Sequence, residues 1–151
     1  MKVMKRIVVC LLAVCMVLAL VACGDKEQTV VLSLEQSQSG VTIKGTTSLT
    51  AKGDKLQKSE ETYEVDITSL DDETKDGMIS LYHEMYTTLY DGIDAATITE
   101  NTTDTTYTIK IAVDYSDISA LQEAGLVTGG DYVSLKGMQD LLEGQGYTVV
   151  K

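Results

Sequence analysis

The sequence contains no proline, tryptophan or phenylalanine, one histidine, and three cysteines that all lie within the first 23 residues. The lack of cysteine after Cys23 excludes disulfides and cysteine-based metal sites from most of the chain. The lack of proline excludes a proline-rich spacer, and the eight tyrosines are the chain's aromatic residues. Basic residues are also scarce, with 12 against 23 acidic residues. This balance excludes nucleic acid as a partner, because its phosphates would be repelled.

The first 22 residues have the layout of a secretory signal. Three basic residues precede an uncharged apolar run of 16 residues from 7 to 22. A helix that crosses a bilayer needs about 20 apolar residues, so this run is short for a permanent anchor. Its end and the next residue, Leu20-Val21-Ala22-Cys23, resemble the bacterial lipobox. We therefore expect residues 1–22 to be a signal peptide and Cys23 to receive the lipid, because a thiolate is nucleophilic enough to be alkylated by a diacylglycerol group.

The alternative is an ordinary signal peptide whose cleavage site happens to contain a cysteine. With the lipid on Cys23, the protein is exported and anchored to the outer face of the cytoplasmic membrane, or to the outer membrane of a cell that has two. Residues 23–28 then form the lipidated cysteine and a short tether, which reaches less than about 20 Å. The chain after residue 22 carries nine lysines against 23 acidic residues, a net charge of about −14. Lipid rather than a basic patch must therefore bind the membrane.

The region 29–151 predicts a single domain that opens with three strands. Apolar and polar residues alternate in three segments, which are 29–35, 41–49 and about 55–67. Gly53 and Asp54 suit a tight turn between the second and the third. In the third segment Leu56 has the opposite parity to the later apolar residues. Either a bulge interrupts this strand or Leu56 still belongs to the turn.

The apolar period then changes to 3.6 residues and predicts a long helix over about 70–90, capped by Ser69. One apolar stripe is expected to face the sheet, formed by Met78, Leu81, Tyr82, Met85, Tyr86, Leu89 and Ile93. Tyr82 and Tyr86 lie near the centre of this stripe, whereas Tyr90 has drifted to its edge beside His83. We therefore expect Tyr82 and Tyr86 to be buried and Tyr90 and His83 to be partly exposed.

The remaining elements complete an α+β pattern. The expected elements are strands at 96–99 and 106–115, a short helix capped by Asp117, a last helix capped by Ser134 that ends at Gly144, and a strand at 147–150. This order has too few long crossovers for a parallel sheet. The predicted fold is an antiparallel β-sheet of about six strands, with one long helix and two short helices packed on one face.

Several segments together resemble the YehR-like bacterial lipoproteins. They are the start at 23–27, the hairpin Lys52-Gly53-Asp54-Lys55 before a Glu/Thr-rich strand, and the ending from Ser134 through Gly146-Tyr147 to Lys151. The similarity covers nearly the whole chain after residue 22, in the same order of elements. The resemblance implies a lipid-anchored α+β domain, and it carries over no catalytic residues.

His83 and Tyr90 are the candidate residues for a binding surface. His83 has no cysteine to share a metal with, so an ordinary surface histidine is the alternative. Tyrosines at 82, 86 and 90 repeat every fourth residue, and such a row either stacks on sugar rings or a partner helix or caps the edge of the core. The run 71–77 fails as a calcium loop because His83 stands where the loop needs glutamate. We therefore expect no metal and no cofactor.

The sequence supports binding better than catalysis. It contains no G-x-S-x-G motif, and its carboxylates are too numerous to single out a pair. The leading interpretation is a non-catalytic binding or accessory module at the cell envelope, attached to the membrane through Cys23. Its partner would be a membrane-proximal protein or a small envelope ligand. The alternative is a small envelope hydrolase or ligand-modifying enzyme that uses acidic residues, which a deep cleft with converging carboxylates would favour.

Overall fold

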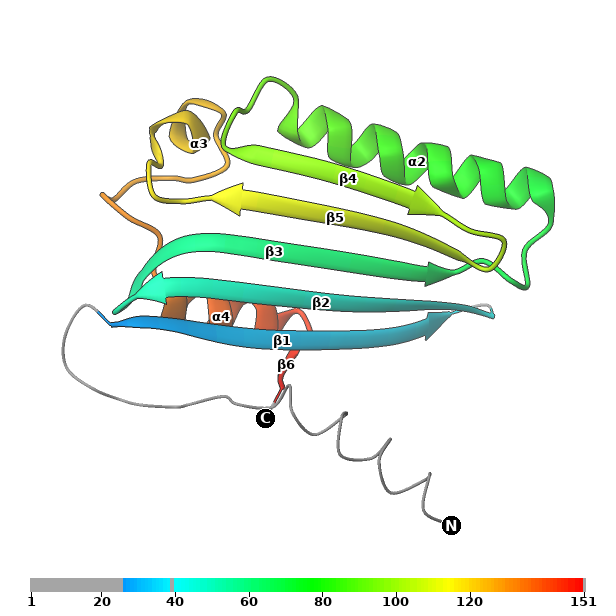
Figure 1. The fold of residues 1–151 in the computed structure, drawn as a ribbon, viewed down its shortest axis with the longest axis horizontal. Helices are drawn as coiled ribbons and strands as arrows, with labels where there is room; N and C mark the ends of the chain where they lie inside the picture. Colours follow the sequence, from blue (N-terminus) through cyan, green and yellow to red (C-terminus); the bar gives the residue numbers. More distant parts are fainter. Residues whose placement is uncertain (1–25, 39, 151) are drawn as a thin grey trace, which may run out of the picture.

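The structure, a computed structural model, describes residues 26–38 and 40–150. The elements are β1 (Glu27–Gln38), β2 (Val41–Lys52), β3 (Lys55–Asp66), α2 (Asp72–Tyr90), β4 (Ala96–Thr102), β5 (Thr106–Asp114), α3 (Ser119–Glu123), α4 (Leu135–Gly144) and β6 (Thr148–Val149) (Figure 1). The predicted signal peptide and Cys23 lie outside the described residues. Of the helices described, none is long and apolar enough to cross a membrane.

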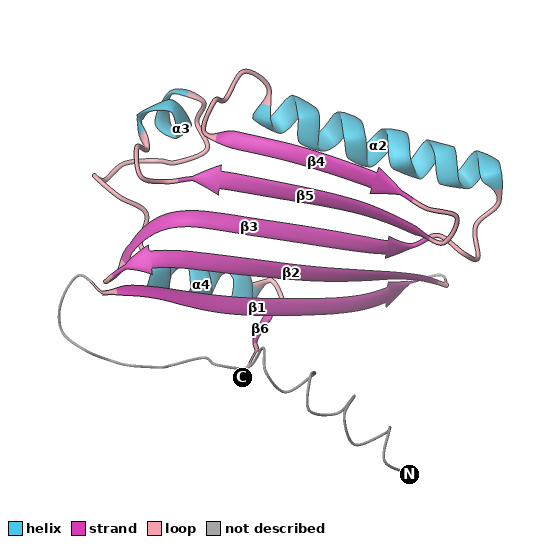
Figure 2. Ribbon diagram, viewed as in Figure 1, coloured by secondary structure: helices cyan, strands magenta, loops and turns pink. Residues whose placement is uncertain are grey.

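The six strands form one antiparallel sheet in the order β4-β5-β3-β2-β1-β6. Three of them, β1, β2 and β3, are 12 residues long and pair with one another in sequence order. Helices α2 and α4 run along the sheet, with α2 beside β4 and α4 behind β1 and β2 (Figure 2). The predicted α+β fold with one long and two short helices is therefore confirmed.

Alternation along the strands gives the sheet two different faces. On the helix-covered face the buried apolar side chains form the core, and they are Leu32, Leu49, Ala51, Leu56, Val65, Ile67, Tyr107, Ile109, Ile111, Val113, Tyr115, Ile118, Leu121, Leu135, Leu142 and Tyr147. The residues between them point to the other face, which we call the open face. Within the part of the chain that the structure describes, these elements share one core.

A bulge resolves the parity of Leu56. Thr50 pairs with Lys58 whereas Ala51 pairs with Leu56, so Gln57 is an extra residue in β3. Leu56 thereby turns into the core although its parity differs from that of Val65. Of the two alternatives in the sequence, the bulge is confirmed.

The predicted cap of the long helix is wrong. Asp71 caps α2, and its carboxylate accepts a hydrogen bond from the backbone N–H of Thr74 at 2.8 Å. Ser69 is engaged elsewhere, because its hydroxyl donates to the carbonyl oxygen of Gly40 at 3.1 Å. That bond ties the chain before α2 to the turn between β1 and β2.

Three of the seven residues in the expected apolar stripe of α2 do not face the sheet. Leu81, Met85 and Leu89 are exposed, and no residue of α2 is fully buried. Tyr82 and Tyr86 are half-buried, because their rings rest on the rings of Tyr107 and Tyr63 in the sheet. Tyr82 and Tyr86 therefore pack against the sheet as predicted, but they are half-buried rather than buried.

The C-terminal part follows the prediction with small shifts. Ser134 caps α4 by accepting a hydrogen bond from the N–H of Gly137 at 3.0 Å. The helix ends at Gly144 as predicted, but Gln145 is its C-cap, and the glycine with a left-handed backbone is Gly146 (φ 100°). Tyr147 then lies over Gly45 of β2, where an added Cβ would stand 2.8 Å from the tyrosine hydroxyl. The absence of a side chain at residue 45 thus allows this close approach.

Candidate functional site

The open face carries polar side chains from every long strand. Register places Lys44 of β2 opposite Glu64 of β3, and Thr106 of β5 opposite Asp66 of β3. Helix α4 lies behind β1 and β2 (Figure 2), and α2 contacts Tyr63 and Tyr107 of the core face, so both helices are on the other side of the sheet. An antiparallel sheet with one solvated face commonly carries such polar residues. Polar residues alone therefore do not indicate a binding site on this face, whereas a hollow lined by them would.

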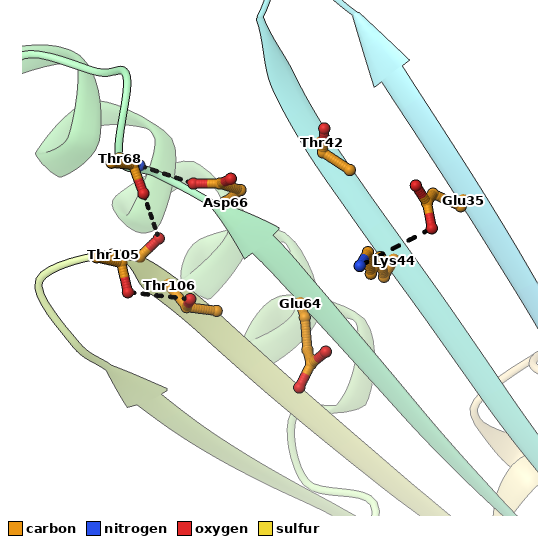
Figure 3. Close-up of a pocket in the computed structure, with 8 residues that line it drawn as sticks. All are labelled: Glu35, Thr42, Lys44, Glu64, Asp66, Thr68, Thr105 and Thr106. Carbon is orange, nitrogen blue, oxygen red and sulfur yellow. Dashed lines mark hydrogen bonds and ion pairs between the residues drawn. The ribbon is translucent and has the colours of Figure 1, made fainter. Parts of the chain in front are cut away.

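Such a hollow lies at the end of the sheet where β1 turns into β2. It has a volume of about 520 Å³ and is lined by Glu35, Thr42, Lys44, Glu64, Asp66, Thr68, Thr105 and Thr106 (Figure 3). Strands β1 and β5 contribute one residue each, β2 and β3 contribute two each, and the turns after β3 and before β5 supply Thr68 and Thr105. We call this site the open-face hollow.

Hydrogen bonds order one side of the open-face hollow. The carboxylate of Asp66 accepts from the backbone N–H of Thr68 at 3.0 Å, and the Thr68 hydroxyl donates to the carbonyl oxygen of Thr105 at 3.5 Å. The hydrogen bonds from Thr68 lower the pKa of Asp66 below its usual value. Across the hollow, the ammonium of Lys44 lies 3.9 Å from the carboxylate of Glu35. Asp66 is therefore fixed as a carboxylate that accepts hydrogen bonds.

The lining residues define what the hollow can hold. Glu35, Glu64 and Asp66 bring three carboxylates against the single ammonium of Lys44, which is already paired with Glu35. The threonine hydroxyls both donate and accept hydrogen bonds. No tyrosine lines the hollow, so it offers no ring for stacking. Within residues 26–38 and 40–150 there is no group of three or more histidine, cysteine, aspartate or glutamate side chains placed to hold a metal ion.

The two sequence candidates, His83 and Tyr90, lie on the opposite side of the sheet. His83 is exposed on α2, and its Nδ1 lies 2.7 Å from the carboxylate of Glu100 on β4. Glu100 also accepts a hydrogen bond from the hydroxyl of Tyr107. Burial alone would raise the pKa of Glu100, but these two hydrogen bonds outweigh it and lower that pKa. The bonds join α2 to the sheet at its β4 edge.

Tyr90 lines a different hollow. It is half-buried, and burial together with the nearby Glu61 raises its pKa to about 12. This second hollow, of about 430 Å³, lies between the end of α2 and β4 and is lined by Thr87, Tyr90, Asp91, Gly92, Ile93, Asp94, Ala96 and Ile98. His83 does not line it. The structure therefore does not bring the two sequence candidates together in one site.

Sequence reasoning missed the residues of the open-face hollow. Their signal is weak, because Lys44, Glu64 and Asp66 occupy ordinary outward positions of predicted strands. The pairing of β3 with β5 rather than with β4 joins Asp66 to Thr106, and this pairing could not be derived from the order of elements. A search for polar residues near the ends of the predicted strands would have found each of these residues. It would not have shown that they lie together in one hollow.

Comparisons with known proteins identify the relatives of this chain. No family model matches it. An uncharacterized lipoprotein of Listeria innocua is 31% identical over 157 residues, a match that covers all of this chain and 99% of the relative.

Two solved structures share the fold. The NMR structure of the YehR protein of Escherichia coli matches with a TM-score of 0.58 at 22% identity, over 85% of this chain and 94% of that one. The NMR structure of a protein from Streptococcus pneumoniae matches with a TM-score of 0.51 at 15% identity, over 85% and 88% of the two chains. The chain therefore belongs to the YehR-like lipoprotein family, in agreement with the resemblance seen in its sequence.

Proposed function

We propose that this protein is a lipid-anchored binding module of the cell envelope, and that the open-face hollow binds a small polar ligand that carries an amino group. The observation that carries the proposal is the lining of the hollow, where three carboxylates and four threonines surround one lysine. A protonated amine satisfies the excess of negative charge, and hydroxyl groups of the ligand pair with the threonines. Amino sugars combine these two features.

The state of the acidic groups supports binding over catalysis. A general acid needs a raised pKa, whereas hydrogen bonds lower the pKa of Asp66 in the hollow. A carboxyl group with a raised pKa does occur at Glu61, but Glu61 lies on the helix-covered face. The single histidine is on that side as well. The carboxyl group with a raised pKa and the histidine are thus separated from the open-face hollow by the sheet.

The position of the hollow supports a module that presents its site away from the membrane. Strand β1 begins at Glu27, four residues after Cys23. Glu35 lies eight residues further along the same strand, about 26 Å at 3.3 Å per residue. With lipid on Cys23, the start of β1 is held near the outer face of the cytoplasmic membrane, or near the outer membrane in a cell with two. The hollow then stands at the far end of the sheet, open to ligands in the envelope.

Calorimetric titration tests the proposal with two matched sugars. Residues 24–151, which contain the core that the structure describes, are titrated with glucosamine, whose amine is protonated at pH 6, and with the neutral N-acetylglucosamine. We expect glucosamine to bind and the neutral sugar to bind much more weakly. The double variant Glu64→Gln/Asp66→Asn should weaken glucosamine binding by about tenfold or more, because it removes two charge-assisted contacts.

A second double variant provides the control. Asp131→Asn/Glu143→Gln removes the same charge from exposed positions that do not line the hollow. It should leave the affinity for glucosamine unchanged. If both double variants lost the same affinity for glucosamine, net charge rather than the hollow would explain the binding. Equal binding of the two sugars would refute recognition of the amine.

A further inference from the structure

Helix α2 carries an exposed row of apolar side chains that the fold does not use. Leu81 is 65% exposed, and Met85 and Leu89 are each 48% exposed. The three are spaced by four residues, so they lie close together along one side of the helix. We call them the apolar row. Contiguous exposed apolar residues on an otherwise polar protein commonly mark an interaction site.

Packing of α2 against the sheet does not account for the apolar row. The helix rests on the sheet through tyrosines, with ring centres 5.9 Å apart for Tyr63 and Tyr86 and 6.1 Å apart for Tyr82 and Tyr107. At about 100° per residue, the apolar row lies on the side of α2 away from His83, which bonds to the β4 edge. Removing the row would therefore leave these contacts between α2 and the sheet in place.

Charge defines the kind of partner that fits. Glu73, Glu84 and Asp91 are exposed and lie within about 20° of one another around the helix axis, alongside the apolar row. The one lysine of α2, Lys75, already lies 4.0 Å from the carboxylate of Asp72. A surface that binds along α2 therefore meets carboxylates beside its apolar contacts. A complementary surface carries lysine or arginine in those positions.

We propose that the apolar row of α2 is the docking site for a basic amphipathic helix of a partner protein. From Leu81 to Leu89 the row rises by eight residue steps, about 12 Å, which corresponds to about two turns of a partner helix. Apolar residues at positions i, i+4 and i+7 of that helix would cover Leu81, Met85 and Leu89, while its lysines face Glu84 and Asp91. This surface is on the opposite side of the sheet from the open-face hollow, so one molecule can bind both ligands.

The same charges argue against two other occupants. A second copy of this chain, related by a twofold axis along the row, would bring Glu84 near its own copy, and each chain carries about 14 net negative charges after residue 22. A bilayer surface with anionic headgroups would be repelled by the carboxylates. The basic helix is therefore the occupant that the surface favours.

Fluorescence anisotropy with designed peptides tests the proposal. The probe is a labelled 18-residue helical peptide with leucine on one face and lysine on the other, added to residues 24–151. A peptide of the same pattern with glutamate in place of lysine is the control. We expect the leucine/lysine peptide to bind and the leucine/glutamate peptide not to bind. The triple variant Leu81→Asn/Met85→Gln/Leu89→Asn should weaken its binding by about tenfold or more, because the apolar contacts are lost while the charge is kept.

Controls separate docking from charge attraction and from unfolding. Tyr132→Gln removes a loop side chain that is likewise 48% exposed and should not change binding. Circular dichroism of the triple variant should match the unsubstituted protein, because the substituted side chains are exposed. Unchanged binding in the triple variant, equal binding of the glutamate peptide, or no binding of either peptide would overturn the proposal. If sedimentation showed that the unsubstituted protein is a dimer and the triple variant a monomer, the surface would be assigned to a second copy of the chain instead.

Discussion

At the scale of the residue, Glu61 is the least expected feature of the core. It lies on the helix-covered face, where its carboxylate accepts a hydrogen bond from the hydroxyl of Tyr63 at 2.9 Å. Tyr147 donates in turn to the hydroxyl of Tyr63 at 3.3 Å. Within the described part of the chain Glu61 has no basic partner, and burial raises its pKa. A tyrosine-bonded carboxyl group thus takes the place of an apolar side chain.

The pH dependence of stability tests this state of Glu61. A carboxyl group whose pKa is raised in the folded protein adds stability below its unfolded pKa of about 4.3, and this is lost as pH rises through the folded value. Glu61→Gln keeps an oxygen that accepts from Tyr63 but cannot ionise. We expect the variant to melt at a higher temperature than the unsubstituted protein at pH 8, with the gap closing toward pH 4. A gap that is constant with pH would contradict the burial of an ionisable carboxyl group.

At the scale of the element, tyrosine rings hold α2 on the sheet. Tyr86 stacks both on Tyr63 of the sheet and on Tyr82 of α2, so its ring takes part in both stacked pairs. Truncation of a buried aromatic costs about 3–5 kcal/mol, and Tyr86 is half-buried. We expect Tyr86→Ala to lower the free energy of unfolding by about 2 kcal/mol. Urea denaturation measures this change.

Met85, the neighbour of Tyr86, serves as the matched control. It is exposed and belongs to the apolar row, so Met85→Ala should change the free energy of unfolding by less than about 0.5 kcal/mol. Equal costs for the two substitutions would mean that α2 packs through its apolar row and not through its tyrosines.

Most elements could be predicted because their patterns are local. Alternation located β1, β2, β3 and β5, and the serine before Leu135 located the start of α4. The orientation of α2 could not be predicted, because its apolar residues span more of the helix than one sheet contact covers. Which part faces the sheet depends on Tyr63 and Tyr107, which come from two strands that are far apart in the sequence. The cap was missed for a similar reason, since Ser69 bonds to a distant turn.

At the scale of the whole molecule, the open-face hollow could not be predicted from the sequence. Its residues come from segments that are up to 71 positions apart, from Glu35 to Thr106. Only the register of four strands brings them together, and single outward positions on a strand look like solvated surface. By contrast, the attachment through Cys23 rests on one contiguous segment, and it stays a prediction because this residue lies outside the described part of the chain.

Removal of the Cys23 thiol tests the attachment. Cys23→Ala leaves no nucleophile for lipid addition, so we expect no incorporation of a labelled fatty acid in growing cells. The protein should then appear as an uncleaved precursor or as a released soluble form, since a single residue carries the whole lipid attachment. Cys15→Ala, within the predicted signal peptide, is the control and should leave labelling intact. Labelling that persists in Cys23→Ala would refute the lipobox assignment.

The location of ligand binding is the most direct test of the proposed function. Amide chemical shifts of residues 24–151, labelled with nitrogen-15, are followed by NMR as glucosamine is added at pH 6. We expect the largest changes at Lys44, Glu64, Asp66 and Thr106 around the open-face hollow, with N-acetylglucosamine producing little change. Changes centred on Tyr90 and residues 91–94, or spread evenly over the acidic surface, would contradict the assignment of the open-face hollow as the binding site.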